Sequence, residues 1–218
     1  MCYFASLIFL GFSQLGAVQN LTIGSFELMT DLIYEEDFSS APKKWKSEGR
    51  GSIWTEEGRL QMDATGVEMT AWCPFEMAGD LLITFQAFIM DPPDANNINF
   101  FFMATGADGA DISKMDLSGA YKEYHDLPNY IMTFTSGYTR LRRNPGFNLV
   151  SENQQVKALS RIQYELAVLL QGDQIRCFIN DIPVHSFRDE SRHRKGRVGF
   201  RTWHTRLWWD NLKVYRVR

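Results

Sequence analysis

Cysteine is scarce in this sequence, which has only Cys2, Cys73 and Cys177 among its 218 residues. So few thiols exclude a disulfide-rich scaffold, and no spacing of His and Cys matches that of a zinc site. Cys73 and Cys177 are expected to be buried free thiols that pack as small hydrophobic side chains. A single disulfide between them is the alternative.

Positive charge is also in short supply. The chain has 23 Lys and Arg against 26 Asp and Glu, and the formal net charge of -3 argues against a nucleic-acid partner. No apolar run reaches the ~20 residues that span a bilayer. The shorter apolar run at residues 3–12, followed by Leu15, Gly16 and Ala17, predicts a signal peptide over residues 1–18. We therefore expect a periplasmic or secreted protein that is not held at a membrane after the signal is removed.

Helical patterns of convincing length are missing as well. The 16 Phe, 8 Tyr, 6 Trp and 16 Gly favour strands and turns. The apolar residues 81–90 predict a strand in the middle of a sheet, with residues 97–105 as its neighbour. Gln171, Gly172 and Asp173 predict a hairpin turn between residues 161–170 and 174–179. The sequence thus predicts an all-β fold, an antiparallel two-sheet β-sandwich or jelly roll, in one domain over residues 28–218.

Polar and aromatic side chains gather in residues 119–147, at a density that a core strand does not need. Lys122, Arg140, Arg142 and Arg143 stand there against Glu123 and Asp126, a local net charge of +2 on an acidic chain. Arg side chains pair bidentately with carboxylate or sulfate oxygens, so the cluster favours a site for an anionic ligand. Solvated charges on a hairpin are the alternative for Arg140 and Lys122.

Several short motifs resemble a known family. AWCP at residues 71–74, GAYKEYH at 119–125, LRRNPGF at 141–147 and GFR at 199–201 resemble the YesU-like family of small concanavalin-A-like, or laminarinase-like, jelly rolls. The closing pattern, YELAVLLQGDQIRCFINDIPV followed by GRVGFRTW and WWDNLKVYRV, is similar to the last strands of that fold. The resemblance implies a link to the breakdown of acidic polysaccharides such as ulvan or rhamnogalacturonan. It also implies a β-elimination, in which a dehydratase forms a 4,5-unsaturated uronate at the non-reducing end.

Removing the C5 proton of a uronate needs a base, an acid and a clamp for the carboxylate. We expect His125 as the base, Tyr124 as the acid and Tyr121 as its rival, with a hydrogen-bonding or core role as the alternative for each. If residues 121–125 form a strand, Tyr121, Glu123 and His125 share one face and Tyr124 the other, whereas an irregular segment lets them converge. The expected substrate-binding residues are Arg142, Arg143, Asn129, Asn144, Trp72, Arg201, Glu123 and Trp203.

Two other functions stay open, a non-catalytic carbohydrate-binding module and a glycoside hydrolase of the same fold. A retaining hydrolase needs two carboxyl groups about 5 Å apart, and residues 81–90 and 97–105 carry none. The expected partner is an acidic oligosaccharide, and the oligomeric state is open. No cofactor is required by this chemistry, although a structural calcium ion would fit if Glu35, Asp37 and Asp210 meet.

Overall fold

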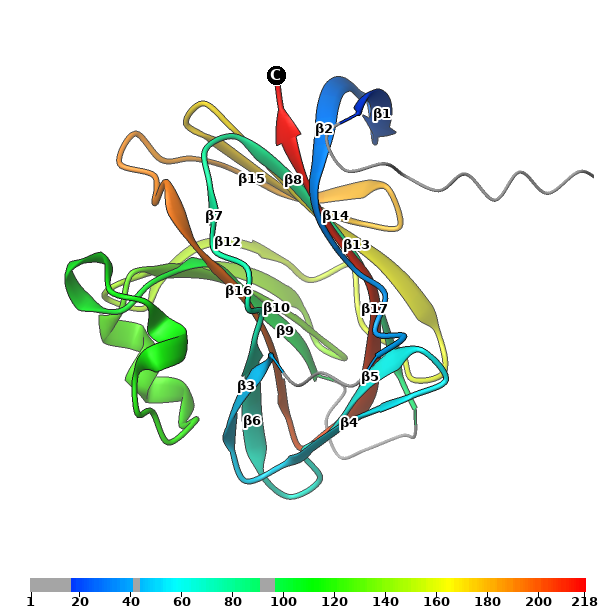
Figure 1. The fold of residues 1–218 in the computed structure, drawn as a ribbon, viewed down its shortest axis with the longest axis vertical. Helices are drawn as coiled ribbons and strands as arrows, with labels where there is room; N and C mark the ends of the chain where they lie inside the picture. Colours follow the sequence, from blue (N-terminus) through cyan, green and yellow to red (C-terminus); the bar gives the residue numbers. More distant parts are fainter. Residues whose placement is uncertain (1–16, 41–43, 91–96) are drawn as a thin grey trace, which may run out of the picture.

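The computed structural model describes residues 17–40, 44–90 and 97–218. Its strands form two antiparallel sheets packed face to face, with the short helices lying outside one of them (Figure 1). The predicted signal peptide lies outside the described residues except for its last two positions. Within the described part of the chain, no helix is long and apolar enough to cross a membrane. The predicted fold class is confirmed.

The nine-stranded sheet has the order β1-β2-β17-β8-β13-β14-β15, with β5 pairing β17 and β4 pairing β5. Its strands are β1 Val18–Ile23, β2 Phe26–Glu36, β4 Ser52–Glu56, β5 Arg59–Asp63, β8 Leu81–Ile89, β13 Gln163–Gln171, β14 Gln174–Ile179, β15 Ile182–Arg188 and β17 Arg206–Val217. The hairpin predicted at Gly172 is confirmed, because β13 and β14 pair across that turn and β15 follows β14.

The eight-stranded sheet has the order β12-β11-β10-β9-β16-β6-β3, with β7 pairing β16. Its strands are β3 Lys46–Gly49, β6 Glu68–Trp72, β7 Met77–Ala78, β9 Asn97–Ala104, β10 Asn129–Thr135, β11 Thr139–Asn144, β12 Asn148–Asn153 and β16 Lys195–Trp203. Three 3₁₀ helices, η1 Ala107–Gly109, η2 Ile112–Lys114 and η3 Tyr121–Asp126, follow β9 and lie on the sheet face turned away from the other sheet (Figure 1).

One predicted pairing is wrong. Strands β8 and β9 were expected to be neighbours, but β8 lies between β17 and β13, whereas β9 lies between β10 and β16 in the other sheet. The two strands instead meet face to face, where the rings of Phe85 and Phe100 lie 4.7 Å apart in an edge-on contact. Each strand reads as a continuous apolar run because side chains on both of its faces are buried, on the inner face by the opposite sheet and on the outer face by β1 at Leu82 and by η3 at Phe101.

Large aromatic side chains fill the space between the sheets. The rings of Phe200 and Trp209 stack at 4.2 Å, and Phe85 contacts both of them. Cys73 and Cys177 are buried free thiols in this core, as predicted. Interdigitated rings of this kind fix the distance between the sheets and give each sheet a stable platform for its outer face.

The nine-stranded sheet begins at Val18, upstream of the domain start predicted at residue 28. Strand β1 pairs with β2 from Val18 to Ile23. Leu21 and Ile23 pack against a cluster on the outer face that includes Leu82 and Phe178. The apolar alternation of residues 21 and 23 explains why this stretch adds a strand to the sheet.

Candidate functional site

The outer face of the eight-stranded sheet is divided into a covered half and an open half. In the covered half, Trp72, Phe101 and Ile131 lie beneath η3 and form a buried cluster with Tyr124 and Leu127. In the open half, register places Arg140, Thr133, Asn99 and Arg201 in one row across β11, β10, β9 and β16. Side chains opposite each other on neighbouring strands share a face, so this row lies on the part of the outer face that the helix does not cover.

Local hydrogen bonds explain why residues 121–126 form a helical turn instead of a strand. At its start, Glu123 accepts hydrogen bonds from the backbone N–H and the hydroxyl of Ser118, at 2.9 and 2.8 Å. At its end, the Asn129 amide donates to the carbonyls of Tyr124 and Leu127, at 2.8 and 2.7 Å. The alternation expected for a strand is therefore wrong, and the irregular arrangement holds.

Tyr124 is fully buried beneath this turn. Its hydroxyl donates to Glu48 Oε2 at 2.7 Å, and Trp72 Nε1 donates to the same oxygen at 3.0 Å. Burial, followed by the charge of Glu48, raises the pKa of Tyr124 far above its usual range. Tyr124, expected as the acid, and Trp72, expected as a substrate-binding residue, thus both donate hydrogen bonds to a buried carboxylate. Neither side chain is accessible to a ligand in this structure.

Three expected binding residues support the neighbouring turn. Asn144 Nδ2 donates to Asn129 Oδ1 at 2.9 Å, and Asn144 Oδ1 accepts from the backbone N–H of Phe147 at 2.8 Å. Both amides are fully buried. Arg143 points away from Arg142, because successive side chains of a strand alternate, and pairs with Asp189 at 2.6 Å. These residues position Phe147, which does reach the open half.

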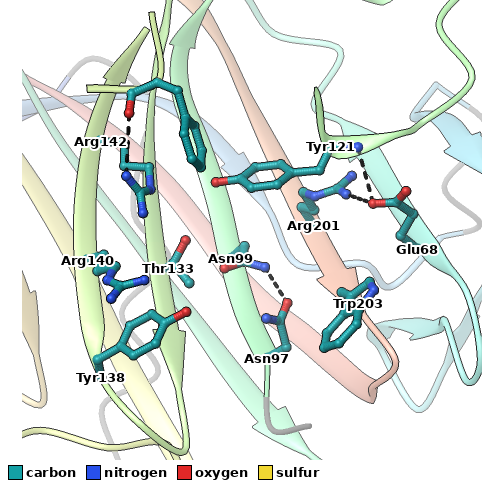
Figure 2. A pocket seen from close by; sticks show the side chains of 11 residues that line it. Glu68, Asn97, Asn99, Tyr121, Thr133, Tyr138, Arg140, Arg142, Arg201 and Trp203 are labelled. Carbon is teal, nitrogen blue, oxygen red and sulfur yellow. Dashed lines mark hydrogen bonds and ion pairs between the residues drawn. The ribbon is translucent and has the colours of Figure 1, made fainter. Parts of the chain in front are cut away.

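A cleft of about 440 Å³ occupies the open half (Figure 2). This volume lies in the range of small-molecule sites, roughly 300–1,000 Å³. Of the expected site residues, the structure brings together Tyr121, Arg142, Arg201 and Trp203 here. The complete lining is Glu68, Asn97, Asn99, Tyr121, Thr133, Tyr138, Arg140, Arg142, Phe147, Arg201 and Trp203.

The aromatic side chains form the walls of the cleft. Trp203 is 46% exposed at the end of β16, a position at which a ring can stack on a ligand. Tyr121 extends over the cleft from the start of η3, with the guanidinium of Arg201 5.0 Å from its ring centre (Figure 2). Burial raises the pKa of Tyr121, against the opposing effect of Arg142 and Arg201. Its phenol is therefore protonated at neutral pH.

The arginines differ in their partners. Arg201 forms an ion pair with Glu68 and donates to the Gly119 carbonyl at 2.8 Å, and Arg140 forms an ion pair with Glu152. Arg142 stacks on Phe147, 4.0 Å from the ring centre. Among the residues that the structure describes, no carboxylate forms an ion pair with Arg142.

His125 lies behind this wall. Its ring stacks on Phe147 at 3.8 Å and meets Tyr121 edge-on at 4.7 Å. Burial and the nearby Arg142 lower the pKa of His125, so the imidazole is neutral at pH 7. His125 does not line the cleft, and neither does Glu123. The rings of Phe147 and Tyr121 thus lie between the expected base and the cleft.

Several lining residues were not expected, among them Glu68, Asn97, Asn99, Thr133 and Phe147. The side chains of Asn97 and Asn99 are hydrogen-bonded to each other, and Asn99 Oδ1 is a buried acceptor without a partner among the described residues. A signal was present in the sequence, because two Asn at alternate positions interrupt the apolar side chains of β9 on one face. Glu68 carried no comparable signal.

No group of three or more metal-ligating side chains occurs among residues 17–40, 44–90 and 97–218. Of the three carboxylates considered for calcium, Glu35 lies 3.1 Å from Lys213 and Asp210 lies 3.8 Å from Arg59. Both carboxylates therefore already have a cationic partner.

Solved structures with this fold include proteins of different functions. A protein of unknown function with a galectin-like fold from Bacillus subtilis is 20% identical, with a TM-score of 0.76 over 85% of this chain and 96% of that one. Carbohydrate-binding module CBM66 from Bacillus subtilis is 16% identical, with a TM-score of 0.57 over 78% of this chain and 93% of that one. An endo-beta-1,3-glucanase from Pyrococcus furiosus is 9% identical, with a TM-score of 0.63 over 91% and 98%.

At these identities the likeness establishes a galectin- and concanavalin-like jelly roll and leaves function open. No curated protein matches the sequence. The narrower resemblance to YesU-like proteins stays a prediction. A family model described as "Domain of unknown function (DUF1961)" matches residues 31–208, which is most of the chain, and the protein belongs to this family.

Proposed function

We propose that the protein binds a saccharide in the cleft, with an acidic group of the ligand held at Arg142. The observation that carries the proposal is the composition of the lining. Exposed Trp203 stands beside hydrogen-bonding amides and hydroxyls and an arginine without a carboxylate partner among the described residues. Rings stack on the apolar faces of sugars, while amides and guanidinium groups bind hydroxyls and carboxylates.

The names of similar structures support a saccharide as the ligand class. They include a carbohydrate-binding module and an endo-beta-1,3-glucanase. Fold alone does not carry function to this chain, so the support rests on the cleft lying on the outer face of one sheet, with its own set of polar and aromatic side chains. Export to the periplasm or the medium, expected from the sequence, agrees with a polysaccharide ligand.

Binding is favoured over hydrolysis by the number of carboxylates. A retaining or inverting glycosidase uses two carboxyl groups that flank the scissile bond. Among the described residues, the cleft lining contains one, Glu68, and its Oε2 is engaged by Arg201 and by the backbone N–H of Tyr121. Among the described residues, the cleft therefore lacks the second carboxyl group that either mechanism needs.

A glycan array of neutral and uronate-containing oligosaccharides tests the proposal. We expect binding to uronate-containing chains, weaker binding at high salt, and weaker binding in Trp203→Ala. Exposed charges are screened within about 10 Å at 0.1 M ionic strength. Equal binding to neutral glucans contradicts the acidic part of the proposal, and a silent array contradicts the proposal as a whole.

A second function, β-elimination from a terminal uronate by a dehydratase, is favoured by Tyr121 alone. Its protonated phenol lies in the cleft between Arg142 and Arg201, where it could protonate the departing hydroxyl while an arginine stabilises the carboxylate and a water molecule in the open cleft takes the C5 proton. His125, the expected base, has no direct access to this space because Phe147 and Tyr121 cover its ring.

Ultraviolet absorbance of an unsaturated uronate, followed during incubation with uronate-containing oligosaccharides, tests this second function. Tyr121→Phe should lower the rate by about 100 to 10,000-fold and leave binding intact. Tyr124→Phe is the matched control, since the Tyr124 hydroxyl faces Glu48 and not the cleft. Binding without any new absorbance in the wild-type protein leaves the carbohydrate-binding function standing alone.

A further inference from the structure

The charges that line the cleft are partly neutralised by carboxylates of the protein. Arg140, Arg142 and Arg201 carry three positive charges and Glu68 carries one negative charge, a net of +2. Glu152, which pairs with Arg140 from β12, lowers this to +1. Two arginines are therefore neutralised within the protein, and the surplus lies at Arg142.

Both neutralised arginines are held in place. Arg201 is 2% exposed and donates to Thr70 Oγ1 at 3.0 Å and to the Gly119 carbonyl at 2.8 Å, in addition to its pair with Glu68. Arg140 packs on Tyr138, 3.7 Å from the ring centre, beside Glu152. A ligand anion would have to displace Glu68 to bind Arg201, and at Arg140 it would meet a charge that Glu152 already offsets.

Arg142 has its donors available. The one hydrogen bond that it makes among the described residues runs from Nη1 to the Phe147 carbonyl, and at 3.4 Å it is long. The face of the guanidinium rests on the Phe147 ring, which leaves its edge, where the N–H groups point, free for an anion. Stacking of this kind fixes the orientation of the group without neutralising its charge.

We infer that Glu68 and Glu152 are specificity-determining residues, which restrict the cleft to saccharides with one anionic group, a carboxylate or a sulfate ester, docked at Arg142. This inference rests on the proposed function and narrows its ligand class. The rest of the ligand is then neutral, because the remaining lining offers amides, hydroxyls and Trp203. A second acidic group would meet only arginines that already have a carboxylate.

The test uses nuclear magnetic resonance on the full chain with three probes: glucose, glucuronate and glucose 6-sulfate. Arginine Nε–H signals and the Trp203 indole signal are recorded during each titration. We expect at least one anionic probe to bind at least tenfold more tightly than glucose and to shift Arg142 while Arg140 and Arg201 stay unchanged. The tighter of the two anions identifies the group.

Isosteric substitutions of the two glutamates then remove the carboxylate partners of Arg140 and Arg201. In Glu152→Gln the Arg140 signal should respond to the anionic probe, and in Glu68→Gln the Arg201 signal should respond. Arg142→Met should remove the preference over glucose. Arg176→Met is the matched control, because Arg176 lies on the other sheet and stacks on Phe26 at 4.7 Å in the same manner; it should change nothing.

The outcomes separate this inference from the proposed function. Equal shifts of all three arginines in the wild-type protein overturn the inference, as do equal affinities for glucose and both anions in the titration of the Trp203 signal. In either case saccharide binding itself stands. Absence of any shift with all three probes also overturns the inference, and the glycan array then decides whether the protein binds saccharides at all.

Discussion

The two sheets carry outer grooves of equal volume and different chemistry. A groove of about 440 Å³ on the nine-stranded sheet lies between β1 and strands β8, β13 and β17, and it matches the volume of the cleft on the eight-stranded sheet. Its charged residues are already engaged, since Glu165 accepts from Gln86 at 2.6 Å and Lys213 lies 3.1 Å from Glu35. Its aromatic residues, Phe85 and Tyr215, are 1% and 6% exposed.

The cleft differs from this groove in two respects that matter for binding. It exposes an aromatic ring, that of Trp203, and it holds an arginine that no described carboxylate neutralises. Polar groups that are already hydrogen-bonded to each other contribute little free energy to ligand binding. Unpaired donors and an exposed ring contribute more, because they form new contacts with the ligand. The volume of a groove therefore does not identify the binding site. The site is identified by side chains that lack a partner among the described residues.

The largest expected effect is a loss of stability from a substitution in the covered half of the eight-stranded sheet, which the open half should not show. Trp72→Ala removes a fully buried ring and a hydrogen bond to Glu48, and should lower the free energy of unfolding by about 3–5 kcal/mol. Urea denaturation measures this change. Trp72→Phe keeps most of the packing and should still bind saccharide. Loss of saccharide binding in a folded Trp72→Phe variant would restore Trp72 as a candidate platform.

How much of the fold the sequence predicts depends on how far apart in the sequence the interacting residues lie. The β13–β14 hairpin was predicted because its turn residues are adjacent in the sequence. The sheet assignment of β8 and β9 was not, because a turn signal between two apolar strands is the same whether the chain returns to its own sheet or crosses to the opposite one. A local sequence pattern predicts that a strand exists, but it does not predict which strand pairs with it.

The candidate site shows the same limit at the level of single residues. Arg142 and Trp203 were identified from motif and residue type and do reach the cleft. Tyr124 and Trp72 were equally plausible by type, yet both are committed to Glu48, which is 76 residues from Tyr124 and 24 from Trp72. A buried carboxylate distant in sequence decides which aromatic residues are available, and no local pattern reveals it.

A smaller effect should distinguish the two tryptophans. Trp203→Ala should leave the free energy of unfolding within about 0.5 kcal/mol, because the ring is 46% exposed. It should weaken saccharide binding by about tenfold, which corresponds to about 1.4 kcal/mol. Isothermal titration calorimetry with an oligosaccharide from the array measures this loss. Ile182→Ala, an exposed residue on the other sheet, serves as the control, and equal affinities of the two variants would remove Trp203 from the site.

The smallest expected effect on ligand binding concerns pH and compares two histidines. Burial lowers the pKa of His185 to about 4 without any charged neighbour contributing, whereas Arg142 contributes to the lowered pKa of His125. Because folding holds His185 neutral, protonation of the unfolded chain should cost stability as the pH falls from 6.5 towards 4. That loss should be independent of ligand, since Arg142 has no part in it.

His125 should respond to the ligand instead. An anion at Arg142 offsets the positive charge that disfavours protonation, so ligand binding should raise the pKa of His125. By linkage, affinity for a uronate should then rise, by less than tenfold, as the pH falls through that pKa and while the ligand carboxylate stays ionised. Nuclear magnetic resonance titration of both rings, with and without glucuronate and in Arg142→Met, measures the shifts. Arg142→Met alone should raise the pKa of His125 and leave His185 unchanged, and a His125 pKa that follows neither change would place the anion away from Arg142.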